Sequence, residues 1–200
     1  MSRRRATGIT LSDGSIADAD YIIPAVDTHV LFASLLAARY MPQALKTAYD
    51  TPEAYPATSG FQVAYSVPAS FPVSETHFYD IAPLCIGKNT FERMNLKVYD
   101  YDTIYQKDGR CVIQTCITQT DDDYAYWKSL TPEEYRTVKQ QLIGEITARI
   151  EKLFPDFKGE AELLDAWTPL TYERYCNAYH GSYMSFITTP MGKQLNLKGT

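Results

Sequence analysis

The sequence contains no run of eighteen apolar residues, so no segment of it is suited to cross a membrane as a helix. The basic start, MSRRRATGITL, is not followed by an apolar stretch long enough for a signal peptide. The net charge of −5 argues against a nucleic-acid partner, because neutralising phosphates requires a basic surface. We therefore expect a cytoplasmic protein that binds no nucleic acid.

Cysteine and histidine are scarce, which limits the metal and redox chemistry of the chain. The four cysteines form no C-x-x-C pair. Cys111 and Cys116 lie five apart in a strand-like run, so their side chains should point to opposite faces, and we expect all four thiols to be reduced. No histidine belongs to an H-E-x-x-H motif, and a structural or surface role is expected for each. The three histidines are His29, His77 and His180.

Motifs for nucleotides, nucleophiles and calcium are also missing. The chain has no G-x-S-x-G, no Walker loop and no G-x-G-x-x-G turn. The acidic run Asp121–Asp123 lacks the spaced ligands of a calcium loop, so we expect it to cap and solvate the approach to a helix. We therefore expect no metal site.

The N-terminal residues predict a hairpin followed by short helices. Asp13-Gly14 is a turn signal between two short strands, expected at Gly8–Leu11 and Ala19–Ala25. Asp27 can then cap a helix, and a second short helix is expected after Pro42. The apolar stripe of the first helix would be Leu31, Leu35 and Ala38, and the second would present Ala44, Leu45 and Ala48. The segment 51–60 is expected to be a loop.

The middle of the chain predicts a sheet. Apolar residues alternate with polar ones in 61–67, which predicts a half-buried strand, and again in 94–99. Asp108-Gly109 turns the chain into a third strand, RCVIQTCITQ. Since no helix separates the last two strands, the sheet should be antiparallel or mixed. A further strand is expected at 160–167.

The clearest helix follows Thr131. Thr131 and Glu134 have the spacing of a capping box, and Pro132 takes the first helical position. One apolar stripe runs along this helix until Pro155 stops it. The stripe consists of Tyr135, Val138, Leu142, Ile146, Ile150 and Leu153.

Tyrosine is abundant, at 16 residues, and several tyrosines lie in the stretch WTPLTYERYCNAYHGSYMSFITTP (167–190). Thr168 can cap a short helix that begins at Pro169, and a strand-like run follows Gly181-Ser182. That glycine permits either a tight turn or a close approach of the backbone to something flat. Many rings outside regular strands suit a ligand site, an interface, or ordinary amphipathic packing. The residues alone leave these alternatives open.

Two segments of this chain resemble a known family. GITLSDGSIADADYIIPAVDTHVLFASLL (8–36) is similar to the hairpin and strand with which flavin-dependent oxidoreductases of the phytoene desaturase, carotenoid isomerase and retinol saturase kind re-enter their FAD domain. The run RIEKLFPDFKGEAELLDAWTPLTYERYCNAYHGSYMSFITTP (149–190) resembles their segment between the substrate domain and the flavin. With the middle included, the resemblance covers nearly the whole chain.

The resemblance implies an α+β fold: a mixed or antiparallel sheet flanked by helices, plus an incomplete piece of the FAD-binding domain. It divides the chain into a partial FAD-domain segment (1–36), a substrate-binding domain (37–167) and a return segment toward the flavin (168–200). The family's N-terminal G-x-G-x-x-G turn and its C-terminal glycine-rich segment are not in this sequence. We therefore expect the central portion of a longer enzyme, inactive alone and not retaining FAD.

The implied reaction is flavin-mediated hydrogen transfer at a carbon–carbon bond of an apolar, polyene-like substrate. No catalytic acid or base is named. Tyr172, Arg174 and Tyr175 would line the flavin side. The backbone would approach the flavin closely at Gly181 and Ser182. Ala25 and Asp27 would lie by the adenosine half of FAD. Tyr172 and Tyr175, three apart on a helix, would otherwise form one packed face.

The expected partners follow from this resemblance. Besides an apolar substrate, we expect a peripheral membrane contact for substrate access. The strands in 8–25 would also leave an unpaired edge. We expect that a second copy of the chain covers this edge, that two copies exchange these strands, or that the strands are disordered.

Two hypotheses compete with the oxidoreductase. One is a self-sufficient carrier whose sheet curls over the helix 132–153 around an apolar pocket and includes the N-terminal hairpin. The other is an interaction module with a flat aromatic patch.

Overall fold

The structure is a computed structural model and describes residues 5–36 and 38–195. Its centre is an antiparallel sheet in the order β4-β5-β7-β3-β8, with a short strand β6 beside β7. The strands are β3 (Ser59–Pro68), β4 (Thr76–Ile86), β5 (Asn89–Tyr99), β6 (Gln106–Lys107), β7 (Arg110–Gln119) and β8 (Glu162–Trp167). The expected α+β architecture with an antiparallel sheet is confirmed.

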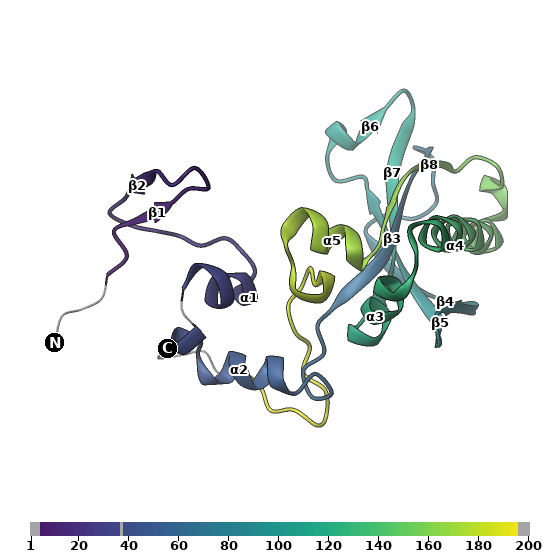
Figure 1. Cartoon of the computed structure of the whole chain (residues 1–200). Helices are drawn as coiled ribbons and strands as arrows, with labels where there is room; N and C mark the ends of the chain where they lie inside the picture. Colours follow the sequence, from purple (N-terminus) through teal and green to yellow (C-terminus); the bar gives the residue numbers. More distant parts are fainter. Residues whose placement is uncertain (1–4, 37, 196–200) are drawn as a thin grey trace.

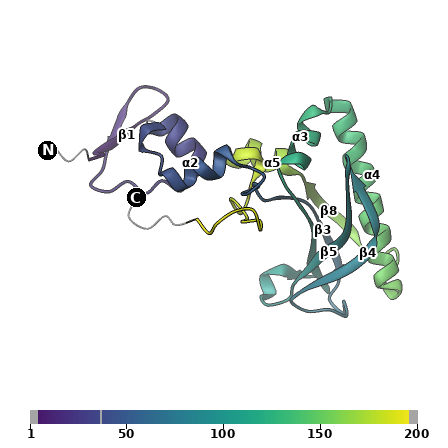
Figure 2. The same ribbon diagram turned by 90° about the horizontal axis from the view of Figure 1, so that it is seen from below.

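Two helices cover one face of this sheet (Figures 1 and 2). Helix α4 (Pro132–Leu153) begins with the predicted capping box, in which Thr131 accepts from the Glu134 N–H and Glu134 accepts from the Thr131 N–H. Helix α3 (Asp121–Ser129) precedes it, so the acidic run forms the first turn of a helix of its own. The favourable position of acidic side chains at a helix N-terminus explains this placement.

The core lies between these helices and the sheet. Trp127 of α3 is fully buried, stacks on Phe61 with ring centroids 5.7 Å apart, and donates its Nε1–H to Gln119 Oε1 at 3.0 Å. Helix α4 contributes Leu142, Ile143, Ile146 and Ile150. The facing strands contribute Phe61, Val63, Tyr65, Met94, Leu96, Val98, Ile113 and Ile117. Side chains therefore fill the space in which the carrier hypothesis placed its pocket.

Three features of the sheet differ from the predictions. Strand β4 was not predicted, because Pro83 and a register shift between Asp80 and Leu84 interrupt its pattern; an edge strand tolerates both. Strand β3 is buried on both faces rather than half-buried, since one face packs in the core and the strand also contacts helix α5 (Pro169–Cys176) and the segment after it. Helix α3 was also missed.

The N-terminal hairpin forms a separate two-stranded sheet, β1 (Gly8–Thr10) and β2 (Ile16–Asp18), away from the main sheet (Figure 1). The turn at Asp13-Gly14 is confirmed, but the strand expected at 19–25 is wrong. The turn aligns Ile16 with Thr10 and therefore Asp18 with Gly8, the first residue of β1. Beyond Asp18 the chain has no β1 residue to pair with, and residues 19–25 are irregular.

Short helices connect the hairpin to the sheet. Asp27 caps α1 (Thr28–Val30), which continues as a π-helical turn η1 (Leu31–Leu35) and a 3₁₀ turn η2 (Ala38–Tyr40). The expected stripe of the first helix is not buried, since Leu35 is 63% exposed. Helix α2 (Gln43–Asp50) follows Pro42 and buries Leu45 and Ala48, as predicted.

The C-terminal segment returns along the end of β3. The 3₁₀ turns η3 (Thr103–Tyr105) and η4 (Pro155–Phe157) lie in the connections before it, and η5 (Tyr179–Gly181) follows α5. Residues 183–189 exchange backbone hydrogen bonds with 54–58, with one bridge between Ala57 and Phe186, instead of forming the expected strand.

No helix among the described residues is long and apolar enough to span a membrane. Within the same residues, no group of three or more His, Cys, Asp or Glu could hold a metal ion. All four cysteines are free.

Candidate functional site

The face of the sheet opposite α4 presents one aligned row of side chains across all five long strands. Strand register pairs Trp167 with Gln62, Gln62 with Cys116, Cys116 with Asn95, and Asn95 with Phe78. Paired residues of antiparallel strands point to the same face, so these five side chains lie side by side. No helix in the described part of the chain runs along this face (Figure 2), which we call the uncovered face, although Gln62 and Cys116 at the centre of the row are only 4% and 5% exposed.

Neutral polar groups on the uncovered face are bonded to one another. The Tyr99 hydroxyl donates to Gln114 Oε1 at 2.6 Å, and Gln114 Nε2 donates to Gln62 Oε1. Gln62 is 4% exposed, so this amide is held inside the protein rather than in water. Such a bonded network orders the side chains of the face.

Helix α5 and the return segment border one end of the row. The Trp167 Nε1–H donates to the Tyr172 hydroxyl at 2.6 Å, and the Tyr172 ring stacks on Tyr183 with centroids 5.3 Å apart. The Tyr183 hydroxyl lies 3.8 Å from Cys116 Sγ. Rings from β8, α5 and the return segment therefore meet the sheet at one place.

These groups are uncharged at neutral pH. Burial raises the pKa of Tyr172 to about 12 and the pKa of the Cys116 thiol to about 11. Burial also raises the pKa of Tyr183, with the nearby thiol adding to the effect. An apolar or neutral ligand therefore suits this end of the face better than an ion does.

A shallow cleft of about 300 Å³ lies at the other end of the row. Its lining includes Phe78, Phe91, Arg93, Asn95, Cys116 and Thr118. Among the described residues, the half-buried Asn95 carboxamide and the exposed Thr118 hydroxyl have no protein hydrogen-bond partner, whereas Arg93 faces Asp80 at 3.8 Å. The cleft therefore combines rings with two polar groups that a ligand can use.

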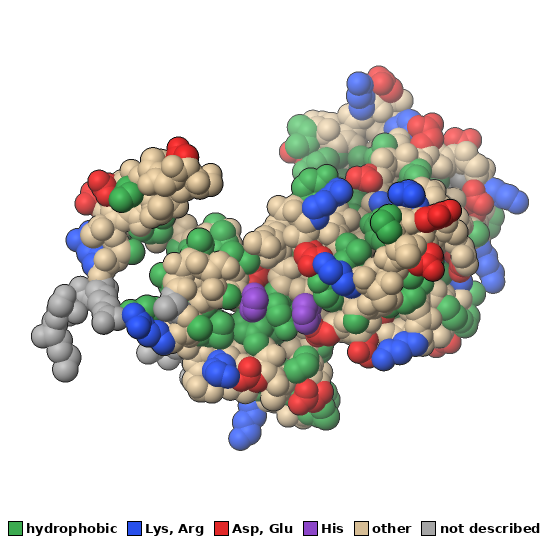
Figure 3. Space-filling view, in the orientation of Figure 1, with side chains coloured by type: hydrophobic (Ala, Val, Ile, Leu, Met, Phe, Trp, Pro, Cys, Tyr) green, Lys and Arg blue, Asp and Glu red, His purple; other side chains and the backbone are tan. Residues whose placement is uncertain are grey.

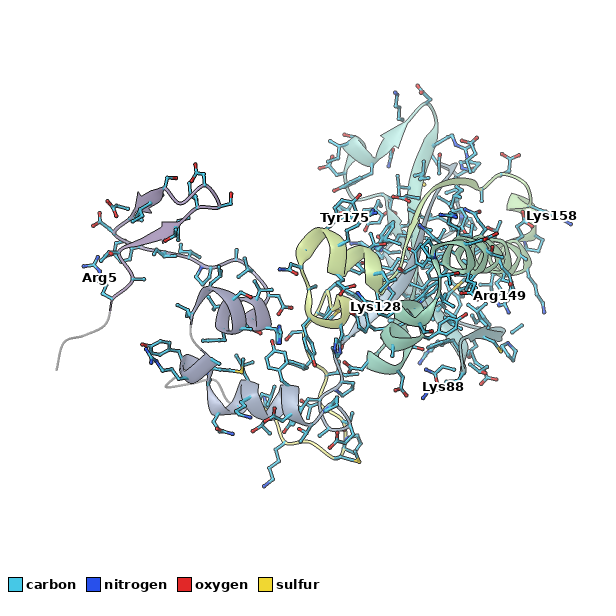
Figure 4. The ribbon with its side chains drawn as sticks, in the orientation of Figure 1. Arg5, Lys88, Lys128, Arg149, Lys158 and Tyr175 are labelled. Atoms are coloured by element: carbon cyan, nitrogen blue, oxygen red, sulfur yellow. The ribbon has the colours of Figure 1, made fainter. Side chains whose placement is uncertain are left out.

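Contacts at its N-terminus and at Glu173 fix α5 beside the uncovered face. Thr168 caps it by accepting from the Leu170 N–H, and the Thr168 hydroxyl also bonds the Tyr135 hydroxyl at 3.1 Å. On the outer side Lys128 and the Tyr124 hydroxyl both bond Glu173, and Figure 4 shows Lys128 beside α5. The helix is thus a fixed support for the rings near it.

Gly181 and Ser182 lie at a packed corner. Gly181 has φ +65°, and a Cβ there would lie 2.0 Å from the Pro169 carbonyl oxygen, so the close approach is to α5 itself. The Ser182 hydroxyl donates to the Ser185 carbonyl at 2.9 Å, and the Ser59 hydroxyl donates to the Gly181 carbonyl at 2.6 Å. The glycine is required by contact between segments of the same chain.

Arg174 and Tyr175 point away from the uncovered face. The Arg174 guanidinium lies over the Tyr175 ring at 4.5 Å, and Tyr175 is 74% exposed on α5 (Figure 4). Both line a separate open cleft of about 540 Å³ with Tyr135, Lys139 and Asp165. Tyr172 and Tyr175 therefore do not share one packed face, and the three residues expected to line the flavin side lie on two surfaces.

Ala25 and Asp27 lie at the junction of the N-terminal segment with the rest of the chain. Ala25 is exposed in the irregular stretch. Asp27 accepts from the His29 N–H at 2.7 Å and from the Tyr179 N–H at 3.1 Å, so both carboxylate oxygens are bonded within the protein. The His29 and Tyr179 rings pack 4.9 Å apart, and histidines are visible at this junction in Figure 3.

Sequence reasoning missed two arrangements. One is the row of Gln62, Cys116 and Asn95, whose members have no common motif and meet only through strand register. The other is a pair of His180 Nδ1 with Asp121 Oδ1, with the His180 ring stacked on Tyr179 at 3.8 Å. No local pattern links residues so far apart, so neither arrangement had a signal in the sequence.

The fold defines an α+β domain with an antiparallel sheet flanked by helices, which leave one face uncovered in the part of the chain that the structure describes. No protein-family model and no solved structure matches the chain. The chain is 24% identical over 188 residues to the chloroplastic prolycopene isomerase of Arabidopsis thaliana, covering 92% of this chain and 31% of the relative. It thus spans about a third of that relative's length, and the similarity suggests a relation to the carotenoid isomerase family.

Proposed function

We propose that this chain is the substrate-binding portion of an FAD-dependent oxidoreductase, of desaturase, isomerase or saturase type, that acts on a hydrophobic, polyene-like molecule. The single observation that supports it most is the uncovered face, where rings and neutral polar groups form one row across five strands. The row spans about 19 Å at the usual strand separation. Its centre, at Gln62 and Cys116, is only 4% and 5% exposed, so the part open to a ligand is the cleft at the Phe78 end. Similarity to prolycopene isomerase over most of the chain supports the same reaction class.

The separate N-terminal hairpin supports this proposal over the carrier. A carrier would use the hairpin in its main sheet, whereas here β1 and β2 pair only with each other among the described strands. The filled core under α4 also leaves the carrier without the pocket that it requires. The uncovered face is therefore the better place for an apolar ligand.

Two of the residues expected to contact FAD already have their contacts within the chain. Both oxygens of Asp27 are bonded to backbone N–H groups, and the backbone at Gly181 approaches Pro169 rather than open space. Under the proposal, FAD would supply hydrogen transfer in the complete enzyme and this chain would not retain it. The part of these residues is to orient the substrate and exclude water on the uncovered face.

Two tests address the proposal. The first is a visible spectrum of the purified chain followed by titration with FAD; we expect no bound flavin, and stoichiometric tight binding would contradict this account. The second measures binding of β-carotene from detergent micelles through quenching of tryptophan fluorescence, since Trp167 lies at one end of the row. Absence of binding would refute a polyene-binding face.

A matched pair of variants locates the binding surface. Thr118→Arg places a charge in the cleft of the uncovered face, whereas Gln140→Arg places the same charge on the exposed side of α4. We expect the first variant to lose β-carotene binding by tenfold or more and the second to bind as the wild type does, since an unpaired charge cannot be buried under an apolar ligand. Equal loss in both would place the ligand elsewhere.

The proposal also includes a dimer formed through the N-terminal hairpin and a peripheral contact with a membrane. Both outer strand edges of the hairpin lack partners among the described strands, and Ile9, Leu11 and Ile16 are exposed. We propose that a second copy covers this edge, which sedimentation at rising protein concentration would reveal as a dimer. Flotation with phosphatidylcholine vesicles tests the peripheral membrane contact proposed for substrate access.

A further inference from the structure

We propose that the open cleft between α4, β8 and α5 is a second binding site, which takes a small organic carboxylate with an apolar or aromatic body. The walls of this cleft come from the N-terminal part of α4, the end of β8 and one side of α5, and its volume is about 540 Å³. It shares no lining residue with the cleft of the uncovered face. The proposal is therefore independent of the proposed function.

Three side chains of the cleft have hydrogen-bond donors to spare. Lys139 is half-buried on α4, and neither its ammonium nor the Arg174 guanidinium forms an ion pair with another described residue. Arg174 donates one N–H to the Tyr175 hydroxyl at 2.9 Å, which orients the guanidinium. The Thr171 hydroxyl accepts from the Thr168 N–H at 3.2 Å and keeps its own proton to donate. Thr171 and Arg174 lie three apart on α5, so they share one side of that helix.

The carboxylate in the lining does not neutralise the two cations. Asp165 accepts from the Ala166 N–H at 2.7 Å, and within the described part of the chain it pairs with neither Lys139 nor Arg174. The lining thus presents two cations and one carboxylate that already has a partner, in a chain whose net charge is −5. An ammonium, a guanidinium and a hydroxyl together offer only donors, and a carboxylate offers only acceptors. This local charge favours an anion.

The rest of the lining favours an organic body over a bare inorganic ion. Ala166 is 4% exposed and Leu170 is half-buried, so both present apolar surface to the cleft. The Tyr135 hydroxyl bonds the Thr168 hydroxyl at 3.1 Å, which leaves its ring for packing. Tyr175 is 74% exposed on α5 (Figure 4). A ring or an alkyl group over these side chains would remove apolar area from water, and the volume lies in the range of small-molecule sites.

The test compares 2-naphthoate with 2-naphthalenemethanol, which has the same ring system and a neutral hydroxyl in place of the carboxylate. Each is titrated into the full chain at pH 7 and low salt, and calorimetry gives the affinity. We expect the wild type to bind the carboxylate at least about tenfold more tightly, the lower end for a hydrogen bond to a charged group, and added salt to reduce this preference. Lys139→Met should abolish the preference without weakening the binding of the alcohol, and Lys139→Arg should retain it.

A control variant and the remaining outcomes locate the site. Lys152→Met removes the same charge from the last turn of α4, outside the cleft, and should bind 2-naphthoate as the wild type does. An equal loss in Lys152→Met and Lys139→Met would overturn the location. Circular dichroism checks that the variants fold, and Arg174→Met provides a second removal of charge from the cleft.

Other results would overturn the class of ligand or the site itself. If the wild type does not bind 2-naphthoate, or binds the alcohol equally, the proposal is wrong. Inorganic phosphate that binds as tightly as 2-naphthoate would mean that the cleft recognises a bare anion. Displacement of 2-naphthoate by FAD would return Arg174 and Tyr175 to the flavin. Binding of β-carotene should be unchanged in Lys139→Met, so a failure of the proposed function would appear in that titration and not in this one.

Discussion

The contact between Gly181 and Pro169 predicts a large difference between two glycine substitutions. Gly181 and Gly159 both have positive φ, at +65° and +80°. A Cβ at Gly159 would meet no heavy atom within 4 Å, whereas a Cβ at Gly181 would lie 2.0 Å from the Pro169 carbonyl oxygen. Substitution by alanine therefore costs backbone strain at both positions and adds a collision at only one of them.

The magnitudes follow from these two terms. A left-handed conformation costs a non-glycine residue about 1–2 kcal/mol, which is the loss expected for Gly159→Ala. Forcing an extra methyl group into a packed contact costs about 1–3 kcal/mol more. Since the atom met is backbone rather than a flexible side chain, Gly181→Ala should lower the free energy of unfolding by about 2–5 kcal/mol.

The assay is urea unfolding at pH 7 followed by tryptophan fluorescence, which reports the core because Trp127 is fully buried. The same variants should be titrated with β-carotene, to separate stability from ligand binding. Equal stability of the two variants would refute the packed corner. If Gly181→Ala then altered only ligand binding, the glycine would be required for close approach of the backbone to a flat ligand instead.

Three further outcomes are expected. Asp27→Ala should cost about 1 kcal/mol through loss of the helix cap, and hydrogen exchange should show faster exchange of the Tyr179 amide that Asp27 holds. Thr168→Ala should cost about 1–2 kcal/mol in urea unfolding, since it removes a cap and leaves the Tyr135 hydroxyl without that partner. Burial raises the pKa of Tyr65 to about 12. Below pH 10 this phenol is protonated in the folded and unfolded states alike, and between pH 10 and 12 the unfolded state loses its proton first, so stability should fall as pH rises. Tyr65→Phe should make that fall shallower, and an unchanged slope would contradict the assignment.

Signals that act within one or two turns of the chain predicted the structure well. The capping box at Thr131 and Glu134, the cap at Thr168 and the turn at Asp13-Gly14 are all confirmed. Each depends on side chains that bond backbone groups a few residues away, so the local sequence contains all the atoms involved.

Elements without such signals were missed or misplaced. Strand β4 contains Pro83, which argues for a loop until the edge position of the strand is known. The burial of both faces of β3 depends on α5, a helix far along the chain. Similarly, residues 19–25 have a strand-like composition but pair with no strand in the described part of the chain.

By itself the sequence determined the α+β class, the capped helices and the stretch of rings at 167–190. Only the tertiary structure decided which of these rings meet the sheet: Tyr172 packs beside Trp167, whereas Tyr175 lies on another surface. It also placed Gln62, Cys116 and Asn95 in one row. The physical reason is that strand register comes from hydrogen bonds between segments distant in the chain, and a shift of one residue would turn every side chain of a strand to the opposite face.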